Sequence, residues 1–216
     1  MMYRVLAAVA AALMLTGCGM TSYSLSSGFA NSSQPSLWNF GQKPAGNQET
    51  ASLDTPARKA PLDKAPKGTF EKAPAGSLSD RDYSHTQLDA DKARELINGY
   101  RRQKGLKPLK LNASLTDAAK AHARDLAKWD RISHFGSDGS NPWDRVKRTG
   151  YNAKLAAENV GTGQVTIEEV MKGWQNSPGH NKNLLLADAE HMGIALVTEP
   201  KTEFKTFWTL VIGSPM

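Results

Sequence analysis

Two histidines and two acids lie where the sequence interrupts its helical periodicity, and side chains of these types can bind metal ions or move protons. His134 and Asp138 fall in the segment SHFGSDG, Glu158 lies in AENVG, and His180 follows the break at Ser-Pro-Gly. Loops held by a rigid scaffold carry a disproportionate share of binding and catalytic residues. These four residues are therefore the candidates for a functional site.

The same four side chains allow more than one chemistry. If His134 and His180 lie a few angstroms apart, they form half of a site for Zn2+ or a similar ion, with open positions for water. If their surroundings push the pKa values of Asp138 and Glu158 apart, the two acids divide into the acid and base that glycan hydrolysis requires. No HExxH or GxSxG motif fixes a reaction class. Metal binding, hydrolysis and a purely structural role all stay open.

Helical periodicity predicts four helices that position these residues. The first spans about 89–104, with Asp89 as its N-cap, and the second carries apolar residues from 115 to 129. His122 lies on the apolar face of the second helix, where we expect a hydrogen-bonded core histidine rather than a ligand. A short third helix begins at 141–142, and a fourth covers about 167–174.

The break at Pro178-Gly179 is expected to end the fourth helix and to turn His180 into a cleft opposite His134. Asn183 would secure the following turn through amide hydrogen bonds.

The C-terminal part changes to strand periodicity. Residues 192–197 and 206–212 read as an antiparallel hairpin with a turn at 199–201, and a third strand is expected near 153–159. Helices first and strands last predict an α+β domain, a layered αβα structure in which helices cover an antiparallel sheet.

The N-terminus reads as an export signal followed by a lipid anchor. A positive charge precedes a short apolar run, so residues 1–17 suit a secretory signal peptide. Small residues before Cys18 resemble the lipobox of bacterial lipoproteins, and Gly19 resembles the pattern sent to the outer membrane. We therefore expect an acylated Cys18 and a protein held in the cell envelope, at the outer membrane facing the periplasm. Cys18 is the only cysteine, so disulfides and cysteine catalysis are excluded.

Residues 18–86 are expected to form an unfolded tether, because this segment is rich in Ser, Gly, Pro and Lys and has no sustained apolar period. The folded domain is then 87–216. The net charge of the whole chain is +6, but from residue 87 onward 19 Lys and Arg stand against 15 Asp and Glu. This dispersed charge and the export signal argue against a nucleic-acid partner.

Four motifs in order, SHFGSDGSNPWDR, AENVGTG, W-x2-SPGHNKNLL and HMGIALV, resemble the bacterial branch of the CAP superfamily (cysteine-rich secretory proteins, antigen five, pathogenesis-related proteins). The resemblance covers about 87–216 and implies a three-layer αβα sandwich with a cleft that holds two histidines and two acids. His134 and His180 match the histidines, and Glu158 matches the acid of a Gly-Glu-Asn motif in which Ala157 replaces glycine. Asp138 is the best match for the second acid.

The resemblance also implies sterol or fatty-acid binding in some members. The leading expectation is therefore an envelope-tethered binding domain for a divalent cation and a lipid or cell-wall ligand. The alternatives are a peptidoglycan hydrolase, less readily a peptide hydrolase, that uses Glu158 with the His pair, and a non-catalytic protein-interaction domain.

Overall fold

The computed structural model describes residues 62–216, and the predicted signal peptide, the lipidation site at Cys18 and residues 18–61 of the predicted tether lie outside them. The described helices are α1 (Ala90–Gln103), α2 (Ala113–Trp129), α3 (Pro142–Arg148), α4 (Ile167–Asn176) and α5 (Pro178–Leu184). The described strands are β1 (Phe70–Glu71), β2 (Lys110–Leu111), β3 (Ile132–Ser133), β4 (Ala153–Thr162), β5 (His191–Thr198) and β6 (Thr206–Pro215).

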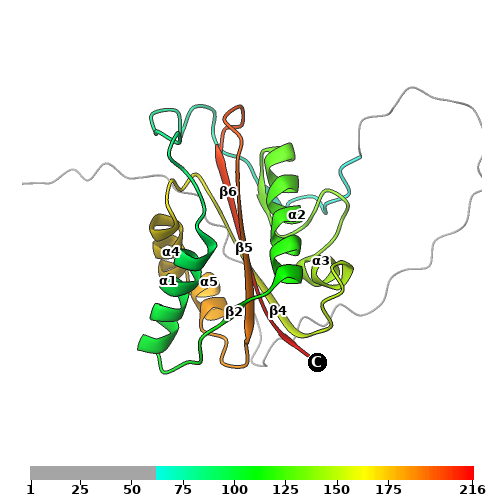
Figure 1. Ribbon diagram of the computed structural model, residues 1–216. Coiled ribbons are helices and arrows are strands. Elements are labelled where there is room, and N and C mark those ends of the chain that lie inside the picture. Colours follow the sequence, from blue (N-terminus) through cyan, green and yellow to red (C-terminus); the bar gives the residue numbers. More distant parts are fainter. Residues whose placement is uncertain (1–61) are drawn as a thin grey trace, which may run out of the picture.

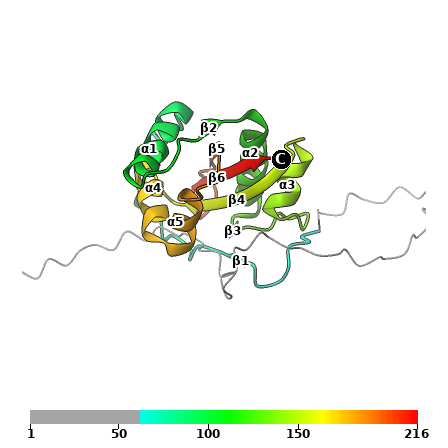
Figure 2. The same ribbon diagram turned by 90° about the horizontal axis from the view of Figure 1, so that it is seen from below.

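The domain has three layers, as the sequence predicts. A central sheet of order β2-β5-β6-β4 separates α2 and α3 on one face from α1, α4 and α5 on the other (Figures 1 and 2). Strands β5 and β6 form the predicted antiparallel hairpin, and β4 pairs antiparallel with β6. The two-residue β2 adds a parallel pair with β5, which the sequence does not reveal because so short a strand has no period.

Alternating side chains of the sheet fill two separate cores. Trp208, Leu210 and Ile212 of β6 pack with Trp174 on the face covered by α1 and α4. Val211, between them in the sequence, packs on the opposite face against α2. This alternation follows from the two-residue period of a strand. The sheet is therefore buried on both faces.

The helix starts follow local chemistry that the sequence already displays. Asp89 accepts hydrogen bonds from the first-turn amides of α1. Asn141 and Asp144 form a capping box at α3, with Pro142 in the first turn.

One local prediction needs correction. The chain does break at Ser177, but Pro178 begins a further helix, α5, so His180 lies in a helical first turn rather than in a loop. The Nδ2 atom of Asn183 donates to Glu158 O (3.1 Å) and to Asn159 Oδ1 (2.9 Å). Asn183 thus ties α5 to β4, instead of securing a turn.

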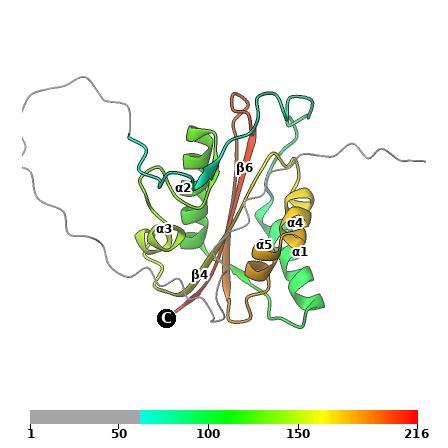
Figure 3. The same ribbon diagram turned by 180° about the vertical axis from the view of Figure 1, so that it is seen from behind.

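The predicted unfolded tether is wrong for residues 62–86, which we call the strap. The strap crosses one end of the sheet from the α2 and α3 layer toward α4 (Figure 3). Strand β1 pairs with β3, and the guanidinium of Arg81 binds Glu169. Leu78 is 2% exposed and belongs to a third, smaller core cluster with Leu126 and Phe207. Isolated apolar residues such as Leu78 leave no periodic signal, which is why the sequence hides this packing.

Within residues 62–216, no helix has the length and apolar character needed to cross a membrane.

Candidate functional site

The carboxylate of Glu158 lies at the centre of a buried polar cluster. Its Oε1 accepts a hydrogen bond from His134 Nδ1 (2.9 Å), and its Oε2 accepts one from Arg145 Nη2 (2.7 Å). His122 Nε2 lies 3.5 Å from Oε1. Glu158 is only 4% exposed. We refer to His122, His134, Arg145 and Glu158 as the Glu158 cluster.

Each member of the cluster comes from a different element. Strand β4 directs Glu158 toward the layer of α2 and α3, because successive strand residues point to opposite faces. Helix α2 supplies His122, whose Nε2 also meets Ser133 O at 2.8 Å. This contact confirms the expected hydrogen-bonded core histidine. His134 directly follows β3, and α3 supplies Arg145.

Arg145 is the residue that sequence reasoning missed. Besides Glu158, its guanidinium donates to the carbonyl oxygens of His134 (3.0 Å) and Ser140 (2.9 Å). Arg145 therefore fixes both the acid and the backbone of the histidine. The available signal was the motif NPWDR, in which the cap at Asn141 places an arginine four residues later on a short helix next to the His134 segment.

Electrostatics keep Glu158 ionised. Burial by itself raises the pKa of Glu158, but the charge of Arg145 and the hydrogen bond from His134 together hold it well below its usual range. Burial, with help from Arg145, lowers the pKa of His122 to about 4. At neutral pH the cluster thus contains one carboxylate, one guanidinium and a neutral His122.

The contact with Glu158 also orients His134. A carboxylate can only accept, so Nδ1 of His134 carries the proton of this bond. His134 is 5% exposed, and its buried Nε2 has no hydrogen-bond partner within residues 62–216. The contact with Glu158 therefore fixes the ring and leaves Nε2 as the nitrogen not engaged by the cluster.

Asp138 lies outside the Glu158 cluster. Its exposed carboxylate accepts from Ser140 N (2.9 Å) and pairs with Arg148. Burial acts to raise the pKa of Asp138, yet hydrogen bonds from Ser140 and the contact with Arg148 lower it overall. The pKa values of Asp138 and Glu158 are both lowered, so neither shows the raised pKa typical of a proton donor in glycan hydrolysis.

His180 is fully buried in the first turn of α5. Its carbonyl oxygen accepts a hydrogen bond from Asn159 Nδ2 (3.1 Å). Asn159 follows Glu158 in β4 and so points to the opposite face of the sheet. The backbone of His180 is thereby fastened behind the strand that carries Glu158. A metal site shared by His134 and His180 stays a prediction.

The Glu158 cluster offers fewer ligands than a resident metal ion usually takes. Within residues 62–216, no group of three or more His, Cys, Asp or Glu side chains is arranged to hold one. A catalytic zinc ordinarily takes three protein ligands and a structural zinc takes four. Arg145 also already neutralises the charge of Glu158, which removes much of the attraction for a dication. We derive no chemical step through a metal.

A small hollow reaches the cluster from the surface. Its cavity volume is about 10 Å3, room for about one water molecule, and it is lined by Asn141, Pro142, Trp143, Ala156, Ala157 and Glu158. The hollow lies between the start of α3 and β4, so a ligand group can approach β4 there without opening the sheet.

Known proteins match both the sequence and the fold. The protein YkwD of Bacillus subtilis (strain 168) is 34% identical over 168 residues, 78% of this chain and 58% of that protein. The membrane protein YlbC of the same organism is 27% identical over 121 residues, 56% of this chain and 35% of that protein. The chain thus spans about half the length of these curated relatives.

Two solved structures share the fold at low sequence identity. An outer surface protein of Borrelia burgdorferi aligns with a TM-score of 0.53 and 21% identity, over 60% of this chain and 97% of that one. An extracellular protein with an SCP domain from Bacillus anthracis str. Ames aligns with a TM-score of 0.51 and 22% identity, over 66% of this chain and 44% of that one. The family model for the cysteine-rich secretory protein family, CAP, matches residues 94–212, which include the whole Glu158 cluster. By this match, the chain belongs to the CAP family.

Proposed function

We propose that this domain is a non-hydrolytic ligand-binding module of the bacterial cell envelope, and that its ligand is a cell-wall glycan. The observation that carries the proposal is the fixed state of the Glu158 cluster. Glu158 is held ionised with both oxygens occupied, while His134 Nε2 is oriented and has no partner among residues 62–216. Such an arrangement suits recognition of a ligand better than transfer of protons.

The unpartnered nitrogen favours a polar ligand over a hydrocarbon chain. Leaving a buried acceptor without a partner costs about 1–3 kcal/mol, and an acyl chain or sterol ring placed against Nε2 would maintain that cost. A hydroxyl or amide N–H donated to Nε2 of His134 removes it. Glycans of the wall carry both groups in every repeat unit.

Retention on purified wall sacculi tests the proposal. The full chain and the variant His134→Phe are each mixed with sacculi and sedimented. The substitution keeps the ring volume and removes Nε2, together with the Nδ1 hydrogen bond to Glu158, so thermal unfolding of the variant is measured as well. His85 is an exposed histidine of the strap, so His85→Phe is the matched control. We expect about tenfold weaker retention for His134→Phe, from 1–2 kcal/mol of lost hydrogen bonding, and no change for the control. Equal retention of all three proteins, or release of soluble glycan fragments that requires Glu158, contradicts the proposal.

A divalent cation is a second occupant for the same nitrogen. The bond from His134 to Glu158 is the kind of contact that orients metal-binding histidines. Calorimetric titration of the chain with Zn2+ decides this point. Heat that saturates at one ion and disappears in His134→Phe and in His180→Phe supports the metal pair, and heat that both variants retain excludes it.

The envelope location is part of the proposal. It is supported by the lipobox-like residues before Cys18 and by the outer-surface and extracellular relatives of the fold. Growth of bacteria expressing the chain with an alkyne-labelled fatty acid tests the anchor. The label should attach to the wild-type chain and be absent from Cys18→Ala, and labelling of both proteins would contradict an anchor at Cys18.

A further inference from the structure

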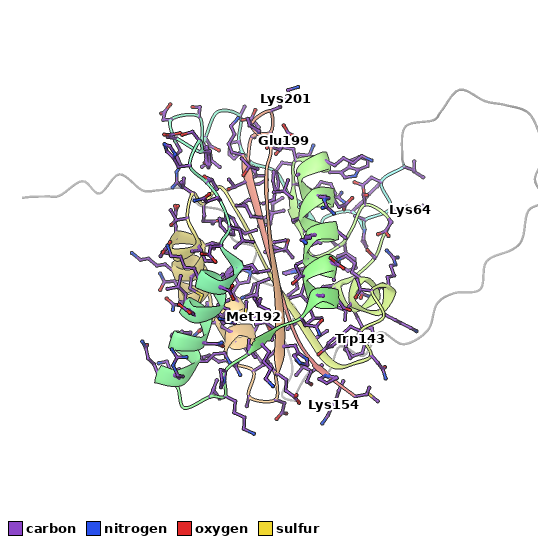
Figure 4. The ribbon with its side chains drawn as sticks, in the orientation of Figure 1. Lys64, Trp143, Lys154, Met192, Glu199 and Lys201 are labelled. Carbon is purple, nitrogen blue, oxygen red and sulfur yellow. The ribbon has the colours of Figure 1, made fainter. Side chains whose placement is uncertain are left out.

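A second and larger hollow lies near the one at Glu158. Its cavity volume is about 310 Å3, and it is lined by Trp143, Lys147, Gly150, Tyr151, Asn152 and Ala153. Trp143 is the residue that lines both hollows. Figure 4 shows Trp143 and Lys154 at the same end of the molecule, near α3 and the C-terminus.

Rigid contacts hold the walls of this second hollow. Tyr151 is 8% exposed, its hydroxyl lies 2.8 Å from His191 Nδ1, and the two rings meet edge to face at 5.9 Å. Burial and the charge of Glu190 raise the pKa of Tyr151 to about 12, so the phenol stays protonated. Met216 N fastens the backbone of Asn152 (2.9 Å). The hollow is therefore formed before any ligand arrives.

The lining combines an aromatic surface with positive charge. Trp143 is half-buried and the lining residue Lys147 is exposed, as is Lys154, which follows the lining residue Ala153. Neither lysine takes part in an ion pair within the described part of the chain, whereas the neighbouring Arg148 is engaged by Asp138. The lining thus offers one unpaired ammonium group and one indole, and Asn152 adds an exposed amide.

We propose that this hollow is a subsite for a pyranose ring that carries a carboxylate. The C–H face of the sugar packs on Trp143, the carboxylate binds the ammonium of Lys147, and ring hydroxyls meet the amide of Asn152. Aromatic side chains with a few placed polar groups are the usual composition of small-ligand sites, and 310 Å3 lies at the lower end of their size range.

The shape of the surface argues against other anionic partners. A bilayer surface needs side chains that project into the headgroups, but Trp143 and Lys147 border a hollow. A free phosphate would use the lysines and leave the indole without a role. An acidic sugar is the ligand class that uses both.

This inference rests on the proposed function, since it assigns the next unit of the same glycan. A glycan whose acidic unit packs on Trp143 would direct a polar group of the adjoining unit toward the small hollow at Glu158. The acidic unit is then a determinant of specificity.

Calorimetric titration of the full chain with two soluble trisaccharides tests the subsite. Trigalacturonic acid supplies carboxylated pyranose rings, and chitotriose is the neutral comparison. The variants are Trp143→Ala and Lys147→Gln. Lys120→Gln, on the exposed side of α2, is the matched control.

We expect the wild type to bind trigalacturonic acid at least tenfold more tightly than chitotriose. The affinity for trigalacturonic acid should fall about tenfold in Trp143→Ala and about threefold to tenfold in Lys147→Gln. The loss of affinity in Lys147→Gln should become smaller as the salt concentration rises. Lys120→Gln should bind as the wild type does. Thermal unfolding of each variant separates lost binding from lost structure, and Lys147→Gln alone suffices if Trp143→Ala does not fold.

Equal affinity for the two trisaccharides, or wild-type affinity in Lys147→Gln, overturns the subsite. That failure is distinct from failure of the proposed function, which is judged by His134→Phe on sacculi. If sacculus retention depends on His134 while Lys147→Gln binds normally, the function stands and the subsite falls. If the protein is not retained on sacculi but its selectivity between the trisaccharides depends on Lys147, the subsite stands by itself.

Discussion

Removing the positive charge from the Glu158 cluster should destabilise the domain severely. Arg145→Met keeps much of the side-chain volume but deletes the hydrogen bonds to Glu158 and to the carbonyl oxygens of His134 and Ser140. Glu158 would remain a carboxylate that is 4% exposed without its main counter-charge. Breaking a buried ion pair from one side costs about 3–5 kcal/mol. We expect the free energy of unfolding, measured in urea at pH 7, to fall by that amount.

The pH dependence of this loss tests its cause. In the wild type the pKa of Glu158 is depressed, so its contribution to stability is complete above the unfolded pKa of about 4.3 and is lost as pH falls toward the folded pKa. In Arg145→Met that depression is largely removed. The difference in the free energy of unfolding between the wild type and Arg145→Met should therefore become smaller below about pH 4.

A second variant separates charge from packing. In the double variant Arg145→Met/Glu158→Gln the uncompensated charge is gone, so part of the loss should be recovered, about 2 kcal/mol relative to Arg145→Met. A loss below about 1 kcal/mol for Arg145→Met, or no recovery in the double variant, would refute the view that Arg145 compensates a buried charge.

Three further predictions concern the rest of the domain. Leu78→Ala should cost about 2–4 kcal/mol in urea unfolding, because this strap residue is 2% exposed in the core, whereas an unfolded strap would give no change. Gly193→Ala should lower the melting temperature strongly or prevent folding, since the added Cβ would lie 2.1 Å from Thr116 N, and a melting temperature near that of the wild type would show that α2 can shift. His122 has its pKa lowered to about 4, so the unfolded chain takes up a proton first and stability falls from about pH 6.5 down to about pH 4, by at most about 1.4 kcal/mol per pH unit. His122→Gln should flatten this slope in urea titrations at a series of pH values, and an unchanged slope would assign it to other groups.

Local patterns predicted most of the elements, because they depend on neighbouring residues. The cap at Asp89 and the apolar period after it predict α1, and the turn at 199–201 between two apolar runs predicts the β5–β6 hairpin. The helix α5 escaped prediction because Pro178-Gly179 reads as a stop, although proline also suits a first helical turn. The ordered strap was not predicted because its contacts join residues far apart in the chain.

The sequence by itself determined the residue types of the site and the family to which the chain belongs. His134 could be chosen as a candidate because loops beside rigid elements carry a disproportionate share of binding residues, whereas Glu158 lies in the middle of β4 rather than in a loop. Only the tertiary structure decided that Arg145 neutralises Glu158, and that Asp138 turns instead to Arg148. Charge pairing and pKa depend on distance and burial, and those quantities exist only once α2, α3 and β4 have packed together.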